Sequence, residues 1–346
     1  MASMEDVLAA LDKETLKQVI LASEIQRKYI PTHSVGLNLV LGGGLSRGHQ
    51  TTFFGGESAG KSTFLLETIA KNQRENPDFS AAWMDTEKTL DREWAARLGV
   101  DTQRLLVAYK SSVGDATDMM VKWINAGVDL IVVDSISNLM PKSFYEKDGT
   151  MREFDKTGAM GRKAQEYGQM CSMLQGVNFE TAMVFISQVR MDLGGFIPTE
   201  KASGGKEVGH LDSMRIKLSA SMAESNALKG EVQRGDFLIE EIIGRKVKWK
   251  IVKNKVNGRY GVGEYNLLTQ GGRVGLDVGA EIRDYGVEYG LIEKVGNSRF
   301  TINGESINGK DNAAAYIASS PELVEFFTDE IGRVLTVQST PVEDDD

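Results

Sequence analysis

Residues 55–62 read G-G-E-S-A-G-K-S and match the phosphate-binding pattern G-x-x-x-x-G-K-[ST]. In such a loop, backbone N–H groups and the amino end of the following helix bind phosphate oxygens, because both carry partial positive charge. Lys61 is expected to reach the β- and γ-phosphates, and the Ser62 hydroxyl to bind Mg²⁺. The chain is therefore predicted to bind a nucleoside triphosphate through Gly55, Gly56, Glu57, Ser58, Ala59, Gly60, Lys61, Ser62 and Thr63.

Acidic residues follow two apolar segments that have the pattern of buried strands. Asp134 ends one of them, where a carboxylate suits indirect Mg²⁺ binding, for example through a water ligand of the ion. Asp85 and Glu87 follow the other, and Glu87 has the longer reach, so it is favoured as the base that polarises the attacking water. The alternative for all three is an ordinary carboxylate in a solvated turn.

Two further sets of polar residues could contact phosphate from more distant parts of the chain. Ser187-Gln188 is predicted to end a strand, and the Gln188 amide could hydrogen-bond the γ-phosphate or its water. Lys253 and Lys255 alternate on a predicted strand, so both face one side and repel each other unless an anion lies opposite. From spacing alone, an ordinary polar strand end is the favoured explanation of Gln188, and solvated edge-strand lysines that of Lys253 and Lys255.

The elements that must position these residues alternate along the chain. Strand patterns precede the loop and recur at 80–85, 104–108, 129–134 and 181–187, whereas helix patterns lie near 61–75, 91–98, 115–126 and 161–176. This alternation predicts an α/β fold with a mostly parallel sheet that is covered by helices on both faces.

Composition describes an ordinary globular chain of 346 residues, with 41% hydrophobic and 26% charged residues. No apolar run approaches the roughly 20 residues of a membrane helix, and the single cysteine allows no internal disulfide, so a reducing cytoplasmic location is expected. The net charge of −9 disfavours nucleic-acid binding by the chain as a whole. Binding depends on the local distribution of charge, however, and residues 245–255 contain six cations and no acid.

The chain is expected to have four parts. Residues 1–30 have the spacing of an amphipathic helical arm, and 31–272 form the nucleotide-binding core. Residues 273–336 form a small α/β domain, and 337–346 an acidic disordered tail. Within the core, a long glycine-rich loop at 192–209 precedes further strands at 213–219, 236–243, 246–253 and 262–268.

These motifs, in this order, resemble the RecA family of strand-exchange recombinases over nearly the whole chain. G-G-E-S-A-G-K-S is similar to the family's Walker A loop, L-I-V-V-D-S to its Walker B strand, and W-M-D-T-E-K-T-L-D to the stretch around its catalytic glutamate. The more specific segments are I-V-K-N-K and the C-terminal G-L-I-E-K-V-G and G-E-S-I-N-G-K-D-N-A. The resemblance implies a P-loop NTPase with a RecA-type core, catalysis by Lys61, Glu87 and Gln188, and Mg²⁺ binding by Ser62 and Asp134.

The resemblance also implies partners. Lys253 and Lys255 would reach the ATP of a neighbouring subunit in a filament, and Asp91 and Trp94 would contact the adenine. DNA would bind two loops near 147–161 and 190–209. The residues expected to contact DNA are Met160, Gly161, Arg162, Lys163, Arg190, Leu193, Gly194, Phe196, Gly204 and Gly205.

The function that follows is that of a DNA-dependent ATPase of homologous recombination, DNA repair and the SOS response. It would form filaments on single-stranded DNA and pair that strand with homologous duplex DNA. Two alternatives share the Walker motifs, namely a hexameric helicase with a RecA core and a filament-forming mediator that does not hydrolyse ATP. The chain also departs from bacterial members at Gln165, Ser172 and His210, and it has an extra segment at about 222–233.

Overall fold

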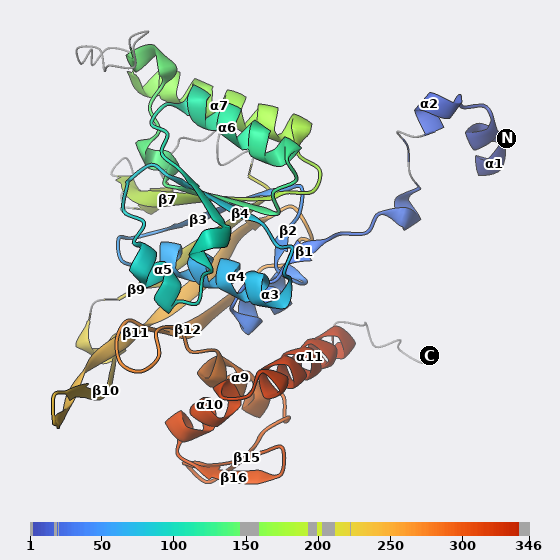
Figure 1. Ribbon diagram of the computed structural model, residues 1–346. Helices are drawn as coiled ribbons and strands as arrows, with labels where there is room; N and C mark the ends of the chain where they lie inside the picture. Colours follow the sequence, from blue (N-terminus) through green and yellow to red (C-terminus); the bar gives the residue numbers. More distant parts are fainter. Residues whose placement is uncertain are drawn as a thin grey trace.

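A computed structural model describes residues 3–16, 19, 21–145, 159–192, 199–202, 212–221 and 223–338. In this part of the chain an 11-stranded sheet runs in the order β13-β12-β11-β9-β3-β7-β6-β4-β5, with β10 paired to β11 and β8 paired to β7 (Figure 1). Its strands are β3 (Gln50–Gly55), β4 (Ala81–Asp85), β5 (Leu105–Ala108), β6 (Leu130–Asp134), β7 (Ala182–Asp192), β8 (Thr199–Ala202), β9 (Met214–Ala220), β10 (Ala227–Arg234), β11 (Phe237–Asn254), β12 (Val262–Leu268) and β13 (Gly275–Leu276).

One half of this sheet is parallel and is covered on both faces. Strands β9, β3, β7, β6, β4 and β5 pair in parallel, as expected from the alternating β and α patterns. Helices α4 (Lys61–Glu75) and α5 (Arg92–Arg97) lie on one face, and α6 (Val113–Asn125) and α7 (Ala159–Val177) on the other. The predicted α/β class is confirmed.

Each helical layer closes its own hydrophobic core. Phe64 and Leu65 of α4 pack with Phe53 of the sheet in the first core. Met170 and Cys171 of α7 pack against the opposite face, where Cys171 is fully buried. Because both faces are buried, the central strands carry continuous apolar runs, and this is the pattern that located them in the sequence.

The other half of the sheet is antiparallel and is built around one long strand. Strand β11 has 18 residues, so the prediction of two strands at 236–243 and 246–253 was wrong. Gly244 lies in the gap between the two predicted strands, and a side chain there would lie 2.2 Å from the carbonyl oxygen of Leu267, so glycine permits close pairing with β12. Together with β10, the first half of β11 forms a hairpin that projects from the body of the molecule.

Strand β7 is also longer than expected, because it continues past Gln188 to Asp192 and pairs there with β8. Gln188 therefore lies within a strand, and the expectation that Ser187-Gln188 ends it was wrong. The predicted long loop at 192–209 is interrupted by β8, and its remaining positions, 193–198 and 203–209, lie outside the described residues.

The amino-terminal arm is helical only in short pieces. Helix α1 (Met4–Ala9) is followed by α2 (Lys13–Leu16) and a 3₁₀ turn at Ala22–Glu24. The Asp12 carboxylate accepts hydrogen bonds from the backbone N–H groups of Glu14 and Thr15, which starts a new helix and breaks the expected continuous one. This segment extends away from the core (Figure 1).

Between the arm and the sheet, the chain forms a short two-stranded ribbon and one helix. They are β1 (Tyr29–Ile30), α3 (Val35–Leu41) and β2 (Leu45–Ser46). Helix α3 is the point at which the carboxyl-terminal unit is attached, because buried Glu281 accepts hydrogen bonds from the Ser34 hydroxyl and from the N–H groups of Val35 and Gly36 at 2.7–3.1 Å. A carboxylate at this position complements the positive end of the helix.

The carboxyl-terminal unit has its own core, which includes Ile282, Phe300 and Phe327. Its elements are α9 (Val278–Glu288), β14 (Glu293–Val295), β15 (Arg299–Ile302), β16 (Glu305–Asn308), α10 (Lys310–Ala318) and α11 (Pro321–Gln338). The acidic disordered tail was predicted at 337–346, but α11 continues to Gln338, so its first two positions are helical, and those from 339 onward lie outside the described residues. Among the described helices, none has the length and apolar character needed to cross a bilayer.

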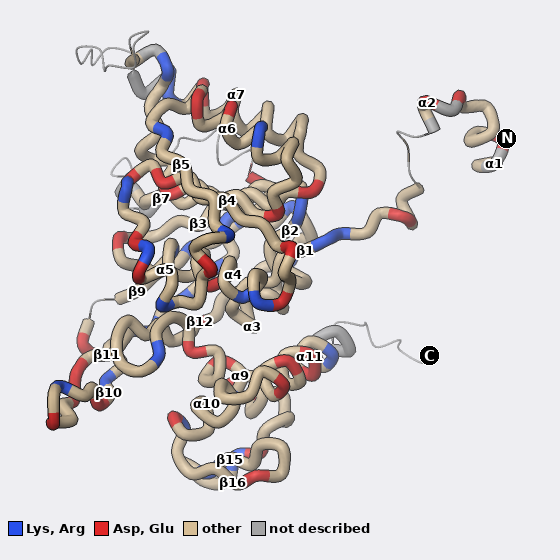
Figure 2. Tube along the Cα trace, in the orientation of Figure 1, with Lys and Arg blue, Asp and Glu red and all other residues tan. Residues whose placement is uncertain are grey.

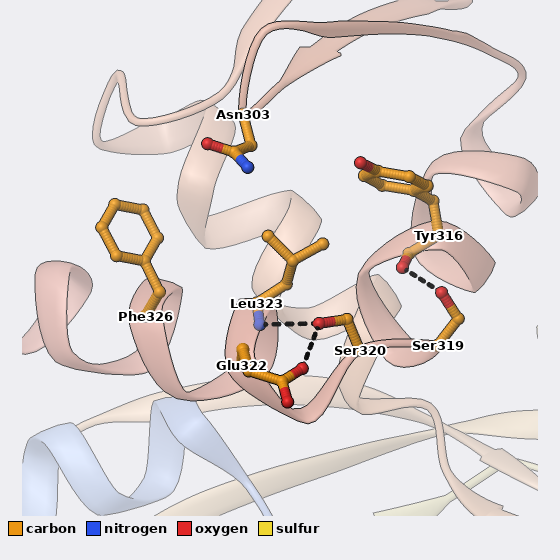
Figure 3. A pocket seen from close by; sticks show the side chains of 7 residues that line it. All are labelled: Asn303, Tyr316, Ser319, Ser320, Glu322, Leu323 and Phe326. Carbon is orange, nitrogen blue, oxygen red and sulfur yellow. Dashed lines mark hydrogen bonds between the residues drawn. The ribbon is translucent and has the colours of Figure 1, made fainter.

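A hollow of about 450 Å³ lies on this unit (Figure 3). Its polar side chains are already engaged locally, since the Ser320 hydroxyl donates to Glu322 at 2.7 Å and the Ser319 hydroxyl donates to the carbonyl of Tyr316 at 2.7 Å. Its lining residues are Asn303, Tyr316, Ser319, Ser320, Glu322, Leu323 and Phe326, none of which is a predicted site residue.

Candidate nucleotide-binding site

The phosphate-binding loop joins the carboxyl end of β3 to the amino end of α4, as the sequence predicted. Ser58 and Gly60 have positive φ angles of 56° and 80°, so the backbone between the two elements is tightly curved. A side chain at position 60 would lie 2.5 Å from Leu267, which is a second reason for glycine there. The loop therefore presents a concave backbone next to a helix amino end, which is an anion-binding arrangement.

Lys61 is the first residue of α4 and its side chain is almost completely buried. Its ammonium group donates to the carbonyl oxygens of Gly55 and Gly56 at 3.0 and 2.8 Å. Burial lowers the pKa of Lys61, and the nearby carboxylates of Asp134, Glu87 and Glu57 oppose that shift. A buried ammonium held on loop carbonyls suits an anionic ligand, because a phosphate offers it stronger acceptors in the same place.

The two predicted Mg²⁺ ligands lie together. The Ser62 hydroxyl donates to the Asp134 carboxylate at 2.6 Å, which links the first turn of α4 to the end of β6. Burial raises the pKa of Asp134 to about 6, with smaller contributions from the charges of Glu87 and Asp85, whereas the Ser62 hydrogen bond lowers it. A hydroxyl and a carboxylate beside a phosphate-binding loop form the oxygen donor set that Mg²⁺ prefers.

Glu87 lies at the centre of a small network between the turn after β4, the turn after β6 and strand β7. Its carboxylate accepts a hydrogen bond from the Ser135 hydroxyl at 2.8 Å and a longer one from the Gln188 amide at 3.5 Å. The backbone N–H of Gln188 also contacts the Ser137 hydroxyl at 3.3 Å. Asp85, the other candidate acid, is instead committed to the backbone, since it accepts from the N–H groups of Thr89 and Leu90.

The predicted adenine-contacting residues lie beside the start of α4. The Trp94 indole N–H donates to the Thr63 hydroxyl at 3.4 Å, and the Arg97 guanidinium lies 5.3 Å from the Trp94 ring. The Asp91 carboxylate caps α5 by accepting from the N–H groups of Glu93 and Trp94, which is a structural role. A hollow of about 520 Å³ begins at Arg97 and continues along residues 271–274.

Lys253 and Lys255 lie at the end of the sheet where the parallel strands begin, and the phosphate-binding loop lies at the other end, where those strands finish. Lys253 pairs with Arg215, which pairs with Thr52 near the start of β3, and the N–H of Lys255 donates to Ser213 at the same level. The strand from Gln50 to Gly55 spans roughly 16 Å. The two lysines therefore do not approach the loop of their own chain.

Burial and the positive charge of Lys255 lower the pKa of Lys253. Asp212 lies fully buried nearby, with its carboxylate 3.7 Å from the Arg215 guanidinium, and burial raises the pKa of Asp212 to about 7. The lysine pair is thus a concentrated positive charge at this edge, next to an acid that burial keeps from full ionisation.

The predicted DNA-contacting residues are only partly within the described chain. Arg162 in α7 is exposed and lies 5.7 Å from the Phe144 ring, whereas the Lys163 ammonium donates inward to the carbonyl of Ser137 at 2.6 Å. For Met160, Gly161 and Arg190 only the backbone is described, in α7 and β7. Leu193, Gly194, Phe196, Gly204 and Gly205 lie outside the described residues, as does the segment 146–158.

Sequence reasoning missed the residues that hold the site together. Ser135 and Ser137 orient Glu87 and Gln188, and buried Asp212 lies among the cations of the far edge. Serines after a strand end are common in turns, so only the position of Ser135 directly after Asp134 gave a signal.

The loop, the Ser62–Asp134 pair and the strand-end glutamate, on a parallel sheet covered by helices, define a P-loop nucleoside triphosphatase. Comparison with known proteins narrows the class. A family model described as the RecA N-terminal domain matches residues 2–273, and the chain belongs to the RecA family.

Curated relatives match over nearly their whole length. The chain is 33% identical to Protein RecA of Arthrobacter sp. (strain FB24), with 99% of this chain and 93% of the relative covered. It is 32% identical to Protein RecA of Paenarthrobacter aurescens (strain TC1), with 99% and 95% covered, and 34% identical to Protein RecA 1 of Myxococcus xanthus, with 92% and 88% covered. The chain is accordingly a DNA-dependent ATPase of recombination and DNA repair, and the helicase and mediator alternatives are not favoured.

Proposed function

We propose that ATP is hydrolysed between adjacent copies of this chain in a filament on single-stranded DNA. The observation that carries the proposal is the placement of the phosphate-binding loop and the Lys253–Lys255 pair at opposite edges of one sheet. Two edges that bear complementary groups can be joined only between copies, and such a head-to-tail contact generates an open helical polymer when the rotation between copies does not close a ring.

In this proposal one copy binds the triphosphate of ATP through the N–H groups of residues 55–63 and the Lys61 ammonium. Ser62 and Asp134 would hold Mg²⁺, whose charge offsets that of the phosphate oxygens. The donor set fits the ion, because both groups are oxygen donors within 2.6 Å of each other. The next copy would add Lys253 and Lys255, which stabilise charge on the transferred phosphoryl group as an arginine finger does.

Glu87 would act as the general base for the attacking water. Its place in the network supports this role, since Ser135 orients the carboxylate without neutralising it. Gln188 would sense the γ-phosphate and transmit its state along β7 to the segment beyond Asp192.

The adenine would lie near Trp94, with Asp91 positioning the turn that carries it. The hollow of about 520 Å³ that begins at Arg97 supports this placement, because Arg97 lies over the Trp94 ring.

DNA would bind on the side of the molecule reached from β7 and the start of α7. Arg162, Arg190 and the loops near 147–161 and 190–209 would contact single-stranded DNA first and homologous duplex DNA second, in the cytoplasm. Lys163 contributes in this proposal by fixing the turn after β6, because its ammonium is bound to Ser137. Phosphate contacts of this kind predict binding that weakens steeply with salt.

The experiment that tests the proposal is ATP hydrolysis with and without single-stranded DNA, over a range of protein concentrations. Strong stimulation by DNA together with a cooperative dependence on protein concentration is the expected result. Hydrolysis that is proportional to protein concentration and indifferent to DNA would rule out the site between copies, although the phosphate-binding loop would remain.

Gln188→Ala tests the proposed connection between the site and DNA. The variant should bind a fluorescent ATP analogue as tightly as the wild type, because Lys61, Ser62 and Asp134 are unchanged. It should lose most of the stimulation of hydrolysis by DNA, and most of the increase in DNA affinity caused by ATP, since thermodynamic coupling is reciprocal. Unchanged coupling in both directions would disprove the role of Gln188.

A further inference from the structure

The hairpin of β10 and β11 carries large apolar side chains in contact with solvent. Phe237 is 72% exposed and Leu238 is 66% exposed, and Ile239 and Ile242 are also exposed. The pairing runs from Ala227–Arg245 to Arg234–Phe237, so these residues lie on the part of the hairpin that projects from the body (Figure 1). Large exposed apolar side chains gathered near the tip of a projecting hairpin indicate an interaction site.

The charge of the hairpin argues against nucleic acid as the partner. Residues 227–242 contain four acidic and two basic residues, and Figure 2 shows acidic residues along the projecting hairpin. One of the two cations, Arg234, is already paired with Glu241. A surface that binds phosphates is basic, so this hairpin suits an apolar partner with basic residues at its rim.

The opposite end of β11 carries exposed apolar side chains with basic residues beside them. Val252 is exposed near the end of β11, and Tyr260 and Val262, exposed by 62% and 70%, lie in and after the turn that follows it. Val262 pairs directly with Lys250, and exposed Val252 follows two residues later at the β-bulge between Ile251 and Lys253, so the two valines lie in the same part of the sheet. Lys253, Lys255 and Arg259 belong to the same edge.

The hairpin projects from the edge of the sheet that carries the phosphate-binding loop. Val247 of β11 pairs with Ala220, which lies beyond the level of Gly55, and the residues before Val247 continue outward from there. Any copy that brings its lysine edge to this loop must therefore approach the hairpin. The two ends of β11 are complementary both in apolar surface and in charge.

We propose that the β10–β11 hairpin docks on the Val252–Tyr260–Val262 surface of the next copy of this chain. The inference rests on the proposed site between copies and adds to it a second contact, distant from ATP. Phe237, Leu238 and Ile239 supply the apolar contact, and the acidic residues of the hairpin face the basic edge of the neighbour. The hairpin thereby sets the position in which Lys253 and Lys255 meet the ATP of the adjacent copy.

The test uses the full chain and two double variants. Phe237→Ser with Leu238→Ser removes the hairpin contact, and Tyr260→Ser with Val262→Ser removes its partner surface. Because a few apolar side chains carry most of the energy of an interface, each variant should need at least about tenfold more protein for half-maximal assembly on single-stranded DNA. Leu106→Ser with Val107→Ser, an exposed pair on β5, is the matched control and should assemble as the wild type does.

Mixing the two variants provides a test specific to a head-to-tail contact. The hairpin of one variant and the surface of the other remain intact, so each mixed pair can form one complete contact. Sedimentation velocity at a concentration where neither variant associates alone should show dimers in the mixture. Absence of dimers would overturn the proposed pairing of these two surfaces.

The controls separate failure of this inference from failure of the proposed function. If the wild type shows neither assembly nor stimulation by DNA, the proposed function itself fails. If the wild type assembles and the hairpin variant assembles equally well, only the hairpin inference is overturned. The same holds if that variant assembles normally but binds duplex DNA less tightly than the wild type does. Unchanged binding of a fluorescent ATP analogue verifies that each variant is folded.

Discussion

Residues at the carboxyl ends of the parallel strands each have a separate role in the chemistry of the site. Lys61 and Ser62 come from the start of α4, Asp134 from β6 and Glu87 from the turn after β4. Ser62 donates a hydrogen bond to Asp134, and Ser135, the next residue in the chain, donates one to Glu87. The carboxyl ends of adjacent parallel strands meet at one edge, so residues far apart in sequence converge there.

Replacing Glu87 with glutamine tests its assignment as the base. Glu87→Gln keeps an oxygen that can accept from Ser135 but cannot take a proton from water, so hydrolysis should fall by about 100-fold or more. Binding of a fluorescent ATP analogue and assembly on DNA should be retained. Glu93→Gln, an exposed acid on α5, is the control, and a Glu87→Gln variant with normal turnover would contradict the assignment.

The sequence predicted the strand-end acids but not which contacts each side chain makes. Asp85 and Glu87 are two residues apart and chemically alike, yet Asp85 caps a turn while Glu87 faces Gln188. Lys163 was expected to meet DNA phosphates but is bound to the carbonyl of Ser137. Such choices depend on packing between distant elements, which spacing along the chain does not record.

At the scale of elements, helix α4 is joined to the antiparallel half of the sheet by a buried acid. Glu67 of α4 accepts a hydrogen bond from the N–H of Leu276 at 2.8 Å, and His33 lies 3.9 Å from the same carboxyl oxygen. Burial raises the pKa of Glu67 to about 8 and lowers the pKa of His33 to about 3. Both groups are therefore mainly uncharged at neutral pH, and the contact between Leu276 and Glu67 is a hydrogen bond to a neutral carboxyl group.

This contact predicts a dependence of stability on pH. The folded pKa of Glu67 lies above its ordinary value of 4.5, so its contribution is complete below about pH 4.5 and is lost as pH rises through about 8. Glu67→Gln cannot ionise, so its stability relative to the wild type should improve by more than about 2 kcal/mol between pH 5 and pH 8.5. Urea unfolding at both values measures this difference.

The control for that measurement is Glu75→Gln, a more exposed acid in the same helix. It should show the same change with pH as the wild type. A Glu67→Gln difference that stays constant from pH 5 to pH 8.5 would show that Glu67 titrates normally and is not held in its neutral form.

The elements themselves were predictable where one periodicity dominates. Helix α4 begins and ends at the expected residues, and the parallel strands were located by their apolar runs. Strand β11 and the amino-terminal arm were not, for opposite reasons. Gly244 looks like a break but allows close pairing, whereas the arm has a helical pattern and extends away from the rest of the described residues, where packing would otherwise stabilise a longer helix.

At the scale of the whole molecule, the two edges of the sheet carry different halves of one site. A mixture of two inactive variants tests this division. Glu87→Gln lacks the base but keeps its lysines, whereas Lys253→Ala with Lys255→Ala keeps the base but lacks the lysines. Each should hydrolyse ATP poorly alone, and an equal mixture should regain about a quarter of wild-type turnover per chain, since random order completes about one site in four.

Wild-type protein diluted with either variant is the control for mixed assembly in that experiment. If the lysines acted on the ATP of their own chain, the mixture of the two variants would show only the sum of the two residual activities. Recovery of ATP hydrolysis would instead require a chain with intact Glu87 to lie next to a chain with intact Lys253 and Lys255.

The burial of Cys171 has a practical consequence for all of these measurements. It is the single cysteine of the chain, it is fully buried in the core beneath α7, and burial raises the pKa of its thiol to about 12. The thiolate is the reactive form, so the native protein should resist maleimide labelling while folded. A cysteine introduced at Asp236, in the turn of the hairpin, would then be the one reactive thiol, and a dye attached there would report docking without a cysteine-free background.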